Sequence, residues 1–295
     1  MRQDASTLNE GNVGQPGELN NIAHQWCWGT VDLSEPHGWN PLVAELATAA
    51  CVMLELWDRV LSERQRAELT DAFAADDARS ARTAAAFLAG VSRLGHANPS
   101  RMTSFGAGQR PSAALDAARA AWRTRALEAG LPLPPPGAPS RRADPEHVTA
   151  AVLPRLTGCD CADHVDGEQC RDRDHQGLYV AAYALNRHGA DVLHSDTVAK
   201  AYRATGGPAW DTVRCALADD VARDAGLGAR TELARLIRPA DPVRLTAFGR
   251  LVSQSNALAL SDTCGGFGSP HDSREVLSER ARRRAREAVA RMRVA

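Results

Sequence analysis

Apolar residues recur every three or four positions through much of the chain. The clearest series begins at residue 42 and consists of Leu42, Leu46, Ala49, Met53, Trp57 and Leu61. This spacing places the apolar side chains on one face of a helix. Asn40 and Pro41 precede the series, and these residue types are favoured at the N-cap and the first helical position. The pattern therefore predicts a buried helix that begins at Pro41.

Further helical segments follow, each bounded by a residue that begins or ends helices. One segment runs to Leu94 and is followed by Gly95, and another, at 112–130, ends at Gly130. Asp144 and Pro145 are expected to open a helix that reaches residue 156. The remaining helices are expected at 176–188, at 208–225, at 242–260 and in the Arg- and Glu-rich C-terminal segment. No segment shows a convincing strand-like alternation, so the predicted fold class is all-α.

Composition supports this fold class and suggests a simple organisation. Aromatic residues make up only 5% of the 295 residues, whereas β-rich proteins use many aromatic and β-branched side chains. Residues 1–24 are polar and aperiodic and are predicted to form a flexible extension. Residues 25–270 are predicted to form one helical domain, which carries a polar insert at 158–175. Residues 271–295 are predicted to form an Arg/Glu helix whose charges mostly face solvent.

Charge and hydropathy narrow the classes of partner. The formal net charge is −1, so no overall field attracts nucleic acid or a membrane surface. No apolar run is long enough to span a bilayer, and no charged and apolar leader is visible. The seven cysteines are an odd number and mostly scattered. A reducing cytoplasm is therefore the expected location.

The polar insert contains a candidate metal site. Its sequence CDCADHVDGEQC offers the ligands of a Cys₃His structural zinc site, namely Cys159, Cys161, His164 and Cys170. The spacing is tighter than that of the usual paired cysteine knuckles, and His175 is a substitute ligand. Free surface thiols and a disulfide remain the alternatives to zinc.

Several helices resemble one known family. Five segments are similar to parts of the HD nuclease domain of the CRISPR-associated helicase-nuclease of type I systems, including its stand-alone form. They are WNPLVAELATAACVMLELWDRVLS, AAAFLAGVSRLGHANPS, HVTAAVLPRL, ALNRHGADVL and RLVSQSNALALSD. The resemblance extends from about Trp28 to Gly268. It implies an HD-domain-like helical bundle. In the family this bundle holds two divalent ions that hydrolyse a phosphodiester.

The resemblance also indicates which positions the metal ligands of this family would occupy. The first ligand His falls on Glu45, and a partner three residues later falls on Thr48. The remaining ligand positions hold residues of mostly different chemistry: Ser92 and Arg93 for the His-Asp pair, His96 for the Lys that follows, Pro145 or its neighbours Glu146 and His147 for the next His, Arg187 and His188 for the paired His, and Asn256 for the last Asp. An arginine at the bridging-Asp position places a fixed positive charge where two dications would bind.

Three functions remain open at this stage. The first is a catalytically inactive HD-nuclease-like protein that binds or regulates a partner. The second is a metal-free enzyme that acts on a small anionic molecule in biosynthesis, with a remodelled pocket formed by Glu45, Ser92, Arg93, His96, His188 and Asn256. The third is a metal-dependent DNA nuclease. A protein or a small anionic ligand is the expected partner, and nucleic acid stays open as a partner although the net charge does not indicate it. No dinuclear catalytic metal centre is expected.

Overall fold

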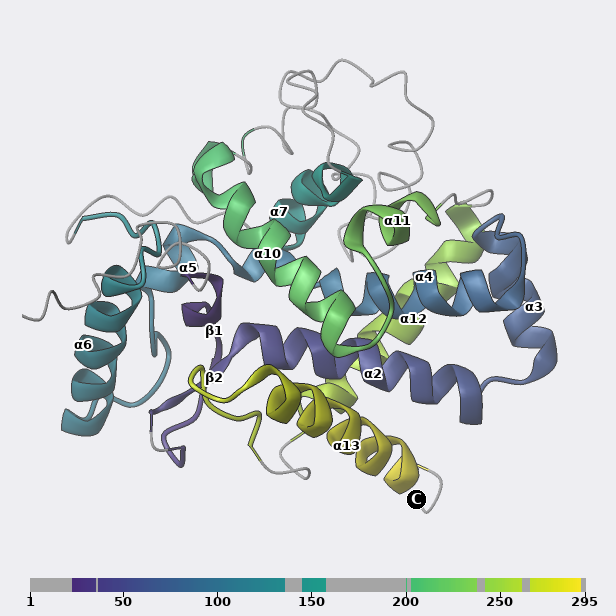
Figure 1. Cartoon of the computed structure of the whole chain (residues 1–295). Helices are drawn as coiled ribbons and strands as arrows, with labels where there is room; N and C mark the ends of the chain where they lie inside the picture. The colour runs from purple at the N-terminus through teal and green to yellow at the C-terminus, as the bar shows by residue number, and fades with distance from the viewer. Residues whose placement is uncertain are drawn as a thin grey trace, which may run out of the picture.

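The computed structural model describes residues 23–35, 37–135, 145–157, 200, 203–237, 242–261 and 266–292. Helices dominate these ranges, as predicted (Figure 1). The larger helices are α2 (Leu42–Arg59), α3 (Glu63–Ala72), α4 (Ala78–Val91), α6 (Ala113–Glu128), α10 (Pro208–Asp224), α12 (Pro242–Ala259) and α13 (Arg274–Met292). The shorter ones are η1 (Ala23–Trp26), η2 (Leu94–His96), α5 (Pro99–Thr103), α7 (Pro145–Val152), η3 (Leu153–Thr157) and α11 (Arg230–Arg235).

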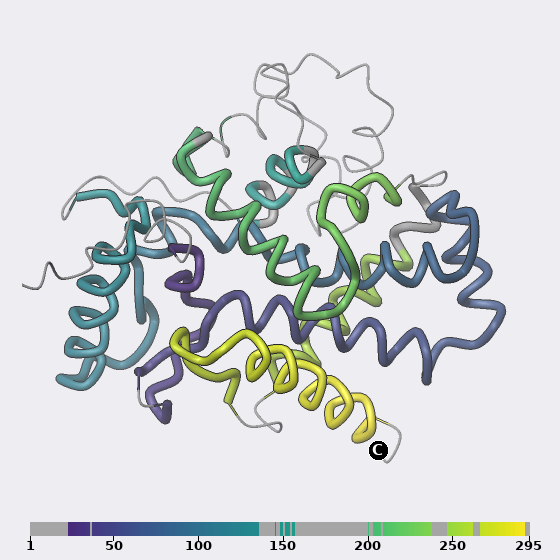
Figure 2. Tube along the Cα trace, viewed as in Figure 1, coloured from purple at the N-terminus to yellow at the C-terminus, as the bar shows by residue number. Residues whose placement is uncertain are grey.

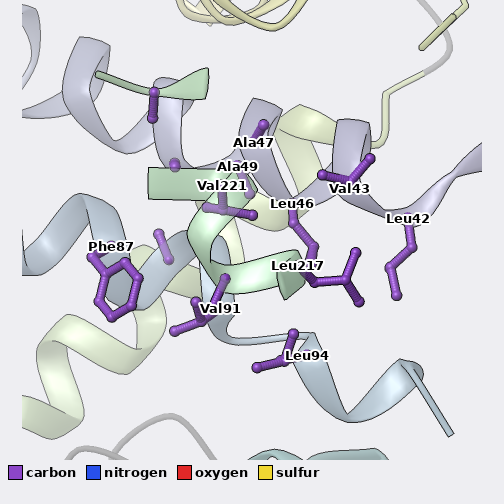
Figure 3. Packing of buried hydrophobic residues seen from close by; sticks show 14 of the residues in the cluster. Leu42, Val43, Leu46, Ala47, Ala49, Phe87, Val91, Leu94, Leu217 and Val221 are labelled. Carbon is purple, nitrogen blue, oxygen red and sulfur yellow. The ribbon is translucent and has the colours of Figure 1, made fainter. Parts of the chain in front are cut away.

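Helix α2 is the central element of the fold. Fourteen of its eighteen residues are buried. The apolar residues of α2 are distributed around the whole helix rather than along one stripe, and a helix of this kind is buried on all sides. Helices α4, α10, α12 and α13 all pack against it. Leu46 of α2, Val91 of α4 and Leu217 of α10 point into the same core (Figure 3).

The C-terminal helix α13 lies along α2, so opposite ends of the sequence are neighbours in space (Figure 2). Most of its charges face solvent, as the sequence indicates. Arg284 departs from this pattern, since only 2% of it is exposed. Its guanidinium donates to the carbonyls of Ala259 and Ser261 and lies over the ring of Phe267. Helix α13 therefore contributes to the core rather than only covering it.

The structure corrects three local predictions. Trp28–Val31 (β1) and Trp39–Pro41 (β2) pair as a short antiparallel hairpin, which the helical spacing did not reveal. Asn40 lies in β2 and is not the N-cap of α2; Pro41 holds that position, with no side-chain cap. Helix α4 ends at Val91 rather than near Leu94.

Gly95 has a different role from the predicted helix stop. Its φ is not positive, and its amide donates to the Thr149 hydroxyl at 2.9 Å. A Cβ at Gly95 would lie 1.9 Å from the carbonyl oxygen of Pro145. The glycine therefore allows α7 to approach η2 closely. By contrast, the helix ends expected at Gly130 and Gly226 are confirmed, and both glycines have positive φ.

Other predicted segments fall partly or wholly outside the described residues. The N-terminal extension is described only from Ala23, and there it forms the buried turn η1. The expected helix at 176–188 and the insert at 158–175 lie outside the described ranges. No helix within those ranges has the length and apolar character needed to cross a membrane.

A buried polar cluster attaches η1 to α10 and α13. His24 Nε2 lies 2.6 Å from Asp220 Oδ2, and both side chains are 4% exposed. Asp220 also forms ion pairs with Arg223 and Arg274. Burial, with the nearby charges of Arg274 and Arg223, lowers the pKa of His24 to about 4. His24 is therefore neutral in the folded protein at pH 7.

This shift predicts a loss of stability in mild acid. The unfolded chain binds a proton on His24 near pH 6.5, whereas the folded chain does so only near pH 4. Stability present above pH 6.5 is therefore lost as the pH falls to 4, by about 3 kcal/mol. We expect the His24→Gln variant to lose less stability than the parent over this range in urea unfolding experiments. His271→Gln changes an exposed histidine and should retain the parental pH dependence; identical slopes in all three proteins would contradict the assignment.

The close approach at Gly95 gives a second prediction. The Gly95→Ala variant should unfold with a free energy lowered by about 2 kcal/mol or more, because backbone atoms of α7 must move. In Gly108→Ala no atom lies within 4 Å of the new Cβ and only the positive φ is strained, so we expect a loss of about 1 kcal/mol. If Gly108→Ala lowers the free energy of unfolding as much as Gly95→Ala or more, the close contact between Gly95 and α7 is not the cause of the loss.

Candidate functional site

The candidate site lies where the beginning of α2 meets the end of α4. The two helices are antiparallel, because Glu45 near the start of α2 pairs with Arg93 just beyond α4, while Asp58 near the end of α2 pairs with Arg82 of α4. An acidic group near a helix N-terminus and a basic group near a C-terminus are both favoured by the helix dipoles. The helix arrangement thus brings Glu45 and Arg93 together.

Glu45 is a buried carboxylate with both oxygens engaged. Its side chain is 0% exposed. Arg93 Nη1 donates to Oε2 at 3.0 Å, and the Thr30 hydroxyl donates to Oε1 at 2.6 Å. Asn40 Nδ2 in turn donates to the Thr30 oxygen at 2.9 Å. The hairpin therefore supplies a chain of hydrogen bonds, all directed toward the carboxylate.

A glycine makes room for this carboxylate. A Cβ at Gly29 would lie 2.3 Å from the Glu45 carboxyl carbon. Arg101, from α5, donates from Nη2 to the carbonyl oxygen of Gly29 at 2.6 Å, and its guanidinium lies 4.6 Å from the centre of the Trp28 ring. A second guanidinium thus lies beside the Glu45–Arg93 pair.

The other predicted residues are placed around this pair. Ser92 donates to the carbonyl oxygen of Ala89 at 2.7 Å and accepts from Asn256 Nδ2 at 3.0 Å. Its proton is therefore committed to the backbone rather than available to a base. Thr48 likewise donates to the carbonyl oxygen of Ala44. These contacts make Ser92 and Thr48 structural partners within and between helices.

His96 carries no charge in this environment. Burial lowers its pKa well below 6.5, and the guanidinium charges of Arg93 and Arg101 lower it further. Its Nδ1 atom is buried and has no hydrogen-bond partner among the described residues. His96 thus adds a neutral imidazole, and not a third cation, to the site.

The structure does not place every predicted site residue. His188 and the proposed zinc ligands Cys159, Cys161, His164 and Cys170 lie outside the described residues, as do the side chains of Glu146 and His147. Within the described residues, no group of three or more His, Cys, Asp or Glu side chains is arranged to hold a metal ion.

Sequence analysis missed three contributors to the site: Gly29, Thr30 and Arg101. Their proximity to Glu45 depends on the hairpin and on α5, which position residues distant in sequence. Asn40 was noticed, but as a helix cap. No local motif marks any of the four as a partner of residue 45.

Comparison with known proteins identifies the scaffold. The model of the family described as "Cas3, HD domain" matches residues 28–253. The chain belongs to the Cas3 HD-domain family. The resemblance recognised in the sequence, and the HD-domain-like all-α fold that it implies, are confirmed.

Solved structures agree with this assignment. A CRISPR-associated protein superposes with a TM-score of 0.67 at 23% identity, covering 94% of this chain and 28% of that one. The Cas3 HD domain of Thermus thermophilus, solved in the presence of Ni²⁺, gives 0.57 at 19% identity, with coverage of 93% and 91%. T. fusca Cas3 with AMPPNP gives 0.52 at 16% identity and covers 90% of this chain but 26% of that one. No curated protein sequence matches this chain.

Among the described residues of this Cas3 HD-domain chain, the side chains at the suggested ligand positions do not form a set that fits a pair of divalent ions. At the described positions in question, the groups are one carboxylate (Glu45), two hydroxyls (Thr48 and Ser92), one amide (Asn256) and the neutral imidazole of His96 at the position of the family's Lys, with the Arg93 guanidinium among them. Hard divalent ions require several carboxylates or imidazoles. Glu45, the one carboxylate in this set, already accepts from Arg93 and Thr30.

The buried Glu45–Arg93 pair should contribute more to the free energy of unfolding than an exposed ion pair does. Removing one member leaves the other buried without its partner, so Glu45→Gln or Arg93→Met alone should lower the free energy of unfolding by about 3 kcal/mol. The double variant should lose less than the sum of the two losses, with a coupling energy of about 2 kcal/mol, measured by urea unfolding of all four proteins.

Asp58 and Arg82 provide the matched control, since they join the same two helices but are 49% and 32% exposed. The corresponding cycle of Asp58→Asn and Arg82→Met should give a coupling energy below about 1 kcal/mol. Equal coupling in the two cycles would mean that burial does not strengthen the Glu45–Arg93 interaction.

Proposed function

We propose that this protein is a catalytically inactive member of the Cas3 HD-domain family with a binding or regulatory role. The observation that carries the proposal is the ion pair between Glu45 and Arg93. A guanidinium within hydrogen-bond distance of the carboxylate would also lie close to any dication that the carboxylate bound. Unlike a histidine or lysine, an arginine cannot lose its proton to relieve that repulsion.

The magnitude of the repulsion supports this proposal. Two unit charges 4 Å apart interact by about 4 kcal/mol at the effective dielectric constant of a protein surface, and a dication doubles this value. Repulsion from Arg93 would therefore oppose the binding of one ion at Glu45 by about 8 kcal/mol, which offsets an attraction of similar size to the Glu45 carboxylate. Movement of Arg93 away from the ion would break the 3.0 Å hydrogen bond.

The other observations point the same way. Ser92 and Asn256 occupy two ligand positions suggested by the resemblance, and they are hydrogen-bonded to each other. Neither residue is a strong ligand for a hard divalent ion. The site is thus held together by polar contacts of its own. Cas3 relatives share the scaffold, but a scaffold does not determine activity.

A nuclease assay tests the proposal directly. Single- and double-stranded DNA are incubated with the full chain and Mn²⁺, Co²⁺ or Ni²⁺, and we expect no cleavage above a protein-free blank. The variant Arg93→Asp removes the guanidinium and supplies a carboxylate, so we expect it to bind Mn²⁺ more tightly than the parent in calorimetry. Metal-dependent cleavage by the parent that disappears in Glu45→Gln would overturn the proposal and favour a nuclease.

Zinc bound by the insert would give a positive metal assay without any catalytic metal, so the experiment must distinguish the two. We propose, from the sequence alone, that Cys159, Cys161, His164 and Cys170 bind structural zinc. The Cys159→Ser/Cys161→Ser variant serves as the control: it should lose bound zinc in elemental analysis and leave the nuclease result unchanged. Retention of zinc in this variant would contradict the assigned ligands.

A further inference from the structure

A row of aromatic rings lies beside the hairpin. The ring centre of Trp26 is 5.9 Å from that of Trp39 and 5.4 Å from that of His271. His37 extends the row, with its ring centre 5.6 Å from that of Trp39. The planes of neighbouring rings are inclined by 43° to 86°. The rings therefore form an angled wall rather than a flat stack, and this wall joins η1, the hairpin and the segment before α13.

These rings line a pocket of about 420 Å³. His271 is exposed, His37 is half-buried and Trp26 is 8% exposed, so a ligand can reach all three. Trp39 is only 1% exposed and supports the accessible rings from behind. The rest of the lining is largely apolar and includes Leu33 and four alanines of α6, Ala114, Ala117, Ala118 and Ala121. Pockets of this size with apolar and aromatic linings and few polar groups are typical small-molecule sites.

Glu35 adds a negative charge to this pocket. It is half-buried, and its carboxylate forms no hydrogen bond or ion pair with any residue that the structure describes. A Cβ at Gly266 would collide with Glu35 Oε1, so this glycine lets the carboxylate lie against the segment before α13. Arg125 also lines the pocket, but it is 66% exposed and pairs with Glu128. Its charge is therefore offset and screened by solvent, and the carboxylate of Glu35 is the uncompensated charge.

We propose that this pocket binds a small organic cation whose charge is covered by methyl groups, namely a quaternary ammonium. The methyl groups contact the apolar lining, and the faces of aromatic rings attract the positive charge. Glu35 supplies the opposite charge. A primary ammonium has three N–H donors that each need an acceptor, whereas a quaternary ammonium has none. A largely apolar lining with one carboxylate among the described residues therefore favours the quaternary form.

Choline is the probe for this site. Its matched control is the neutral carbon analogue, in which a tert-butyl group replaces the trimethylammonium group without a change of shape. Each is titrated into the full chain at constant ionic strength and pH 8, where histidine is ordinarily neutral. The indole N–H signals in NMR spectra report binding: those of Trp26 and Trp39 should shift, whereas that of Trp57, which lies outside the pocket, should not.

We expect choline to bind at least about fivefold more tightly than the neutral analogue, because only choline interacts with the ring faces and with Glu35 through its charge. Equal affinities would show that the pocket selects apolar groups and not cations, and would overturn the proposal. Absence of choline binding would overturn it as well.

Variants of two carboxylates test the role of Glu35. Glu35→Gln keeps the shape of the side chain and removes its charge, so it should weaken choline binding by at least about fivefold. Glu279→Gln alters an exposed carboxylate of α13 outside the pocket and should leave the affinity unchanged. Parental affinity in Glu35→Gln, or an equal loss in both variants, would contradict the assignment.

A second pair of variants tests the location without altering Glu35. Ala117 and Ala120 are both exposed on α6, but only Ala117 lines the pocket. Arginine is a good helix former, so both substitutions are expected to fold. Ala117→Arg places a positive charge at the pocket wall and should weaken choline binding by at least about threefold, whereas Ala120→Arg should bind as the parent does. The same affinity in these two variants would argue against this pocket.

A quaternary ammonium reaches such a pocket either as a free small molecule or as a trimethylated lysine of a partner protein. A peptide with one trimethyllysine between neutral residues distinguishes these sources. Tighter binding of the peptide than of choline assigns the ligand to a partner protein, and tighter binding of choline assigns it to a free molecule. Either ranking supports the site.

This inference does not depend on the Glu45–Arg93 pair, so the two proposals fail separately. Metal-dependent DNA cleavage by the parent would overturn the inactive assignment, while choline binding measured in EDTA would be unaffected. Absence of choline binding, with no nuclease activity, would remove the cation site and leave the inactive assignment in place.

Discussion

The ion pair between Glu45 and Arg93 is the interaction on which the centre of this protein depends. It joins the start of α2 to the end of α4, where the two helix dipoles favour a carboxylate and a guanidinium. Burial makes each charge dependent on the other, since neither is adequately solvated alone. The hairpin contributes Thr30, Asn40 and the space at Gly29, so the pair also fixes the entry of the chain into α2.

Packing around α2 explains why the pair is buried. Helices α4, α10, α12 and α13 surround α2, and small residues permit close approach: a Cβ at Gly90 would lie 2.5 Å from a methyl group of Val221. The first turn of α2 is therefore enclosed rather than exposed. A glutamate at that position must find partners within the protein, and Arg93 and Thr30 provide them.

The Cas3 HD-domain scaffold thus carries a site whose chemistry depends on a few side chains. Hydroxyl, amide and guanidinium groups form the contacts described here, and the Asn256–Ser92 and Arg93–Glu45 contacts join helices to one another. Arg101 lies beside these contacts and donates to the carbonyl oxygen of Gly29. The scaffold and the chemistry of the site are accordingly separate properties: apolar packing determines the first, and a small set of buried polar residues determines the second.

Apolar spacing in the sequence was sufficient to predict the all-α class and the helices at 112–130, 208–225 and 242–260, because helix formation and burial follow a local period. Five of the predicted helical segments were also sufficient to recognise the resemblance to the HD nuclease family. The hairpin was not predictable in this way, since β1 and β2 are short and their pairing joins residues eight to thirteen positions apart.

Nor did the sequence reveal Arg101 and Thr30 as neighbours of Glu45, or the close approach of α7 at Gly95. Those contacts join residues far apart in the chain, and no local pattern encodes which side chains will meet. The sequence by itself determined the all-α class, several of the larger helices and the family. The resemblance placed Glu45 and Arg93 in one predicted pocket, but only the tertiary structure decided that the two form an ion pair and that Arg101 lies beside them. Charge partners in a protein interior are determined by packing geometry and burial.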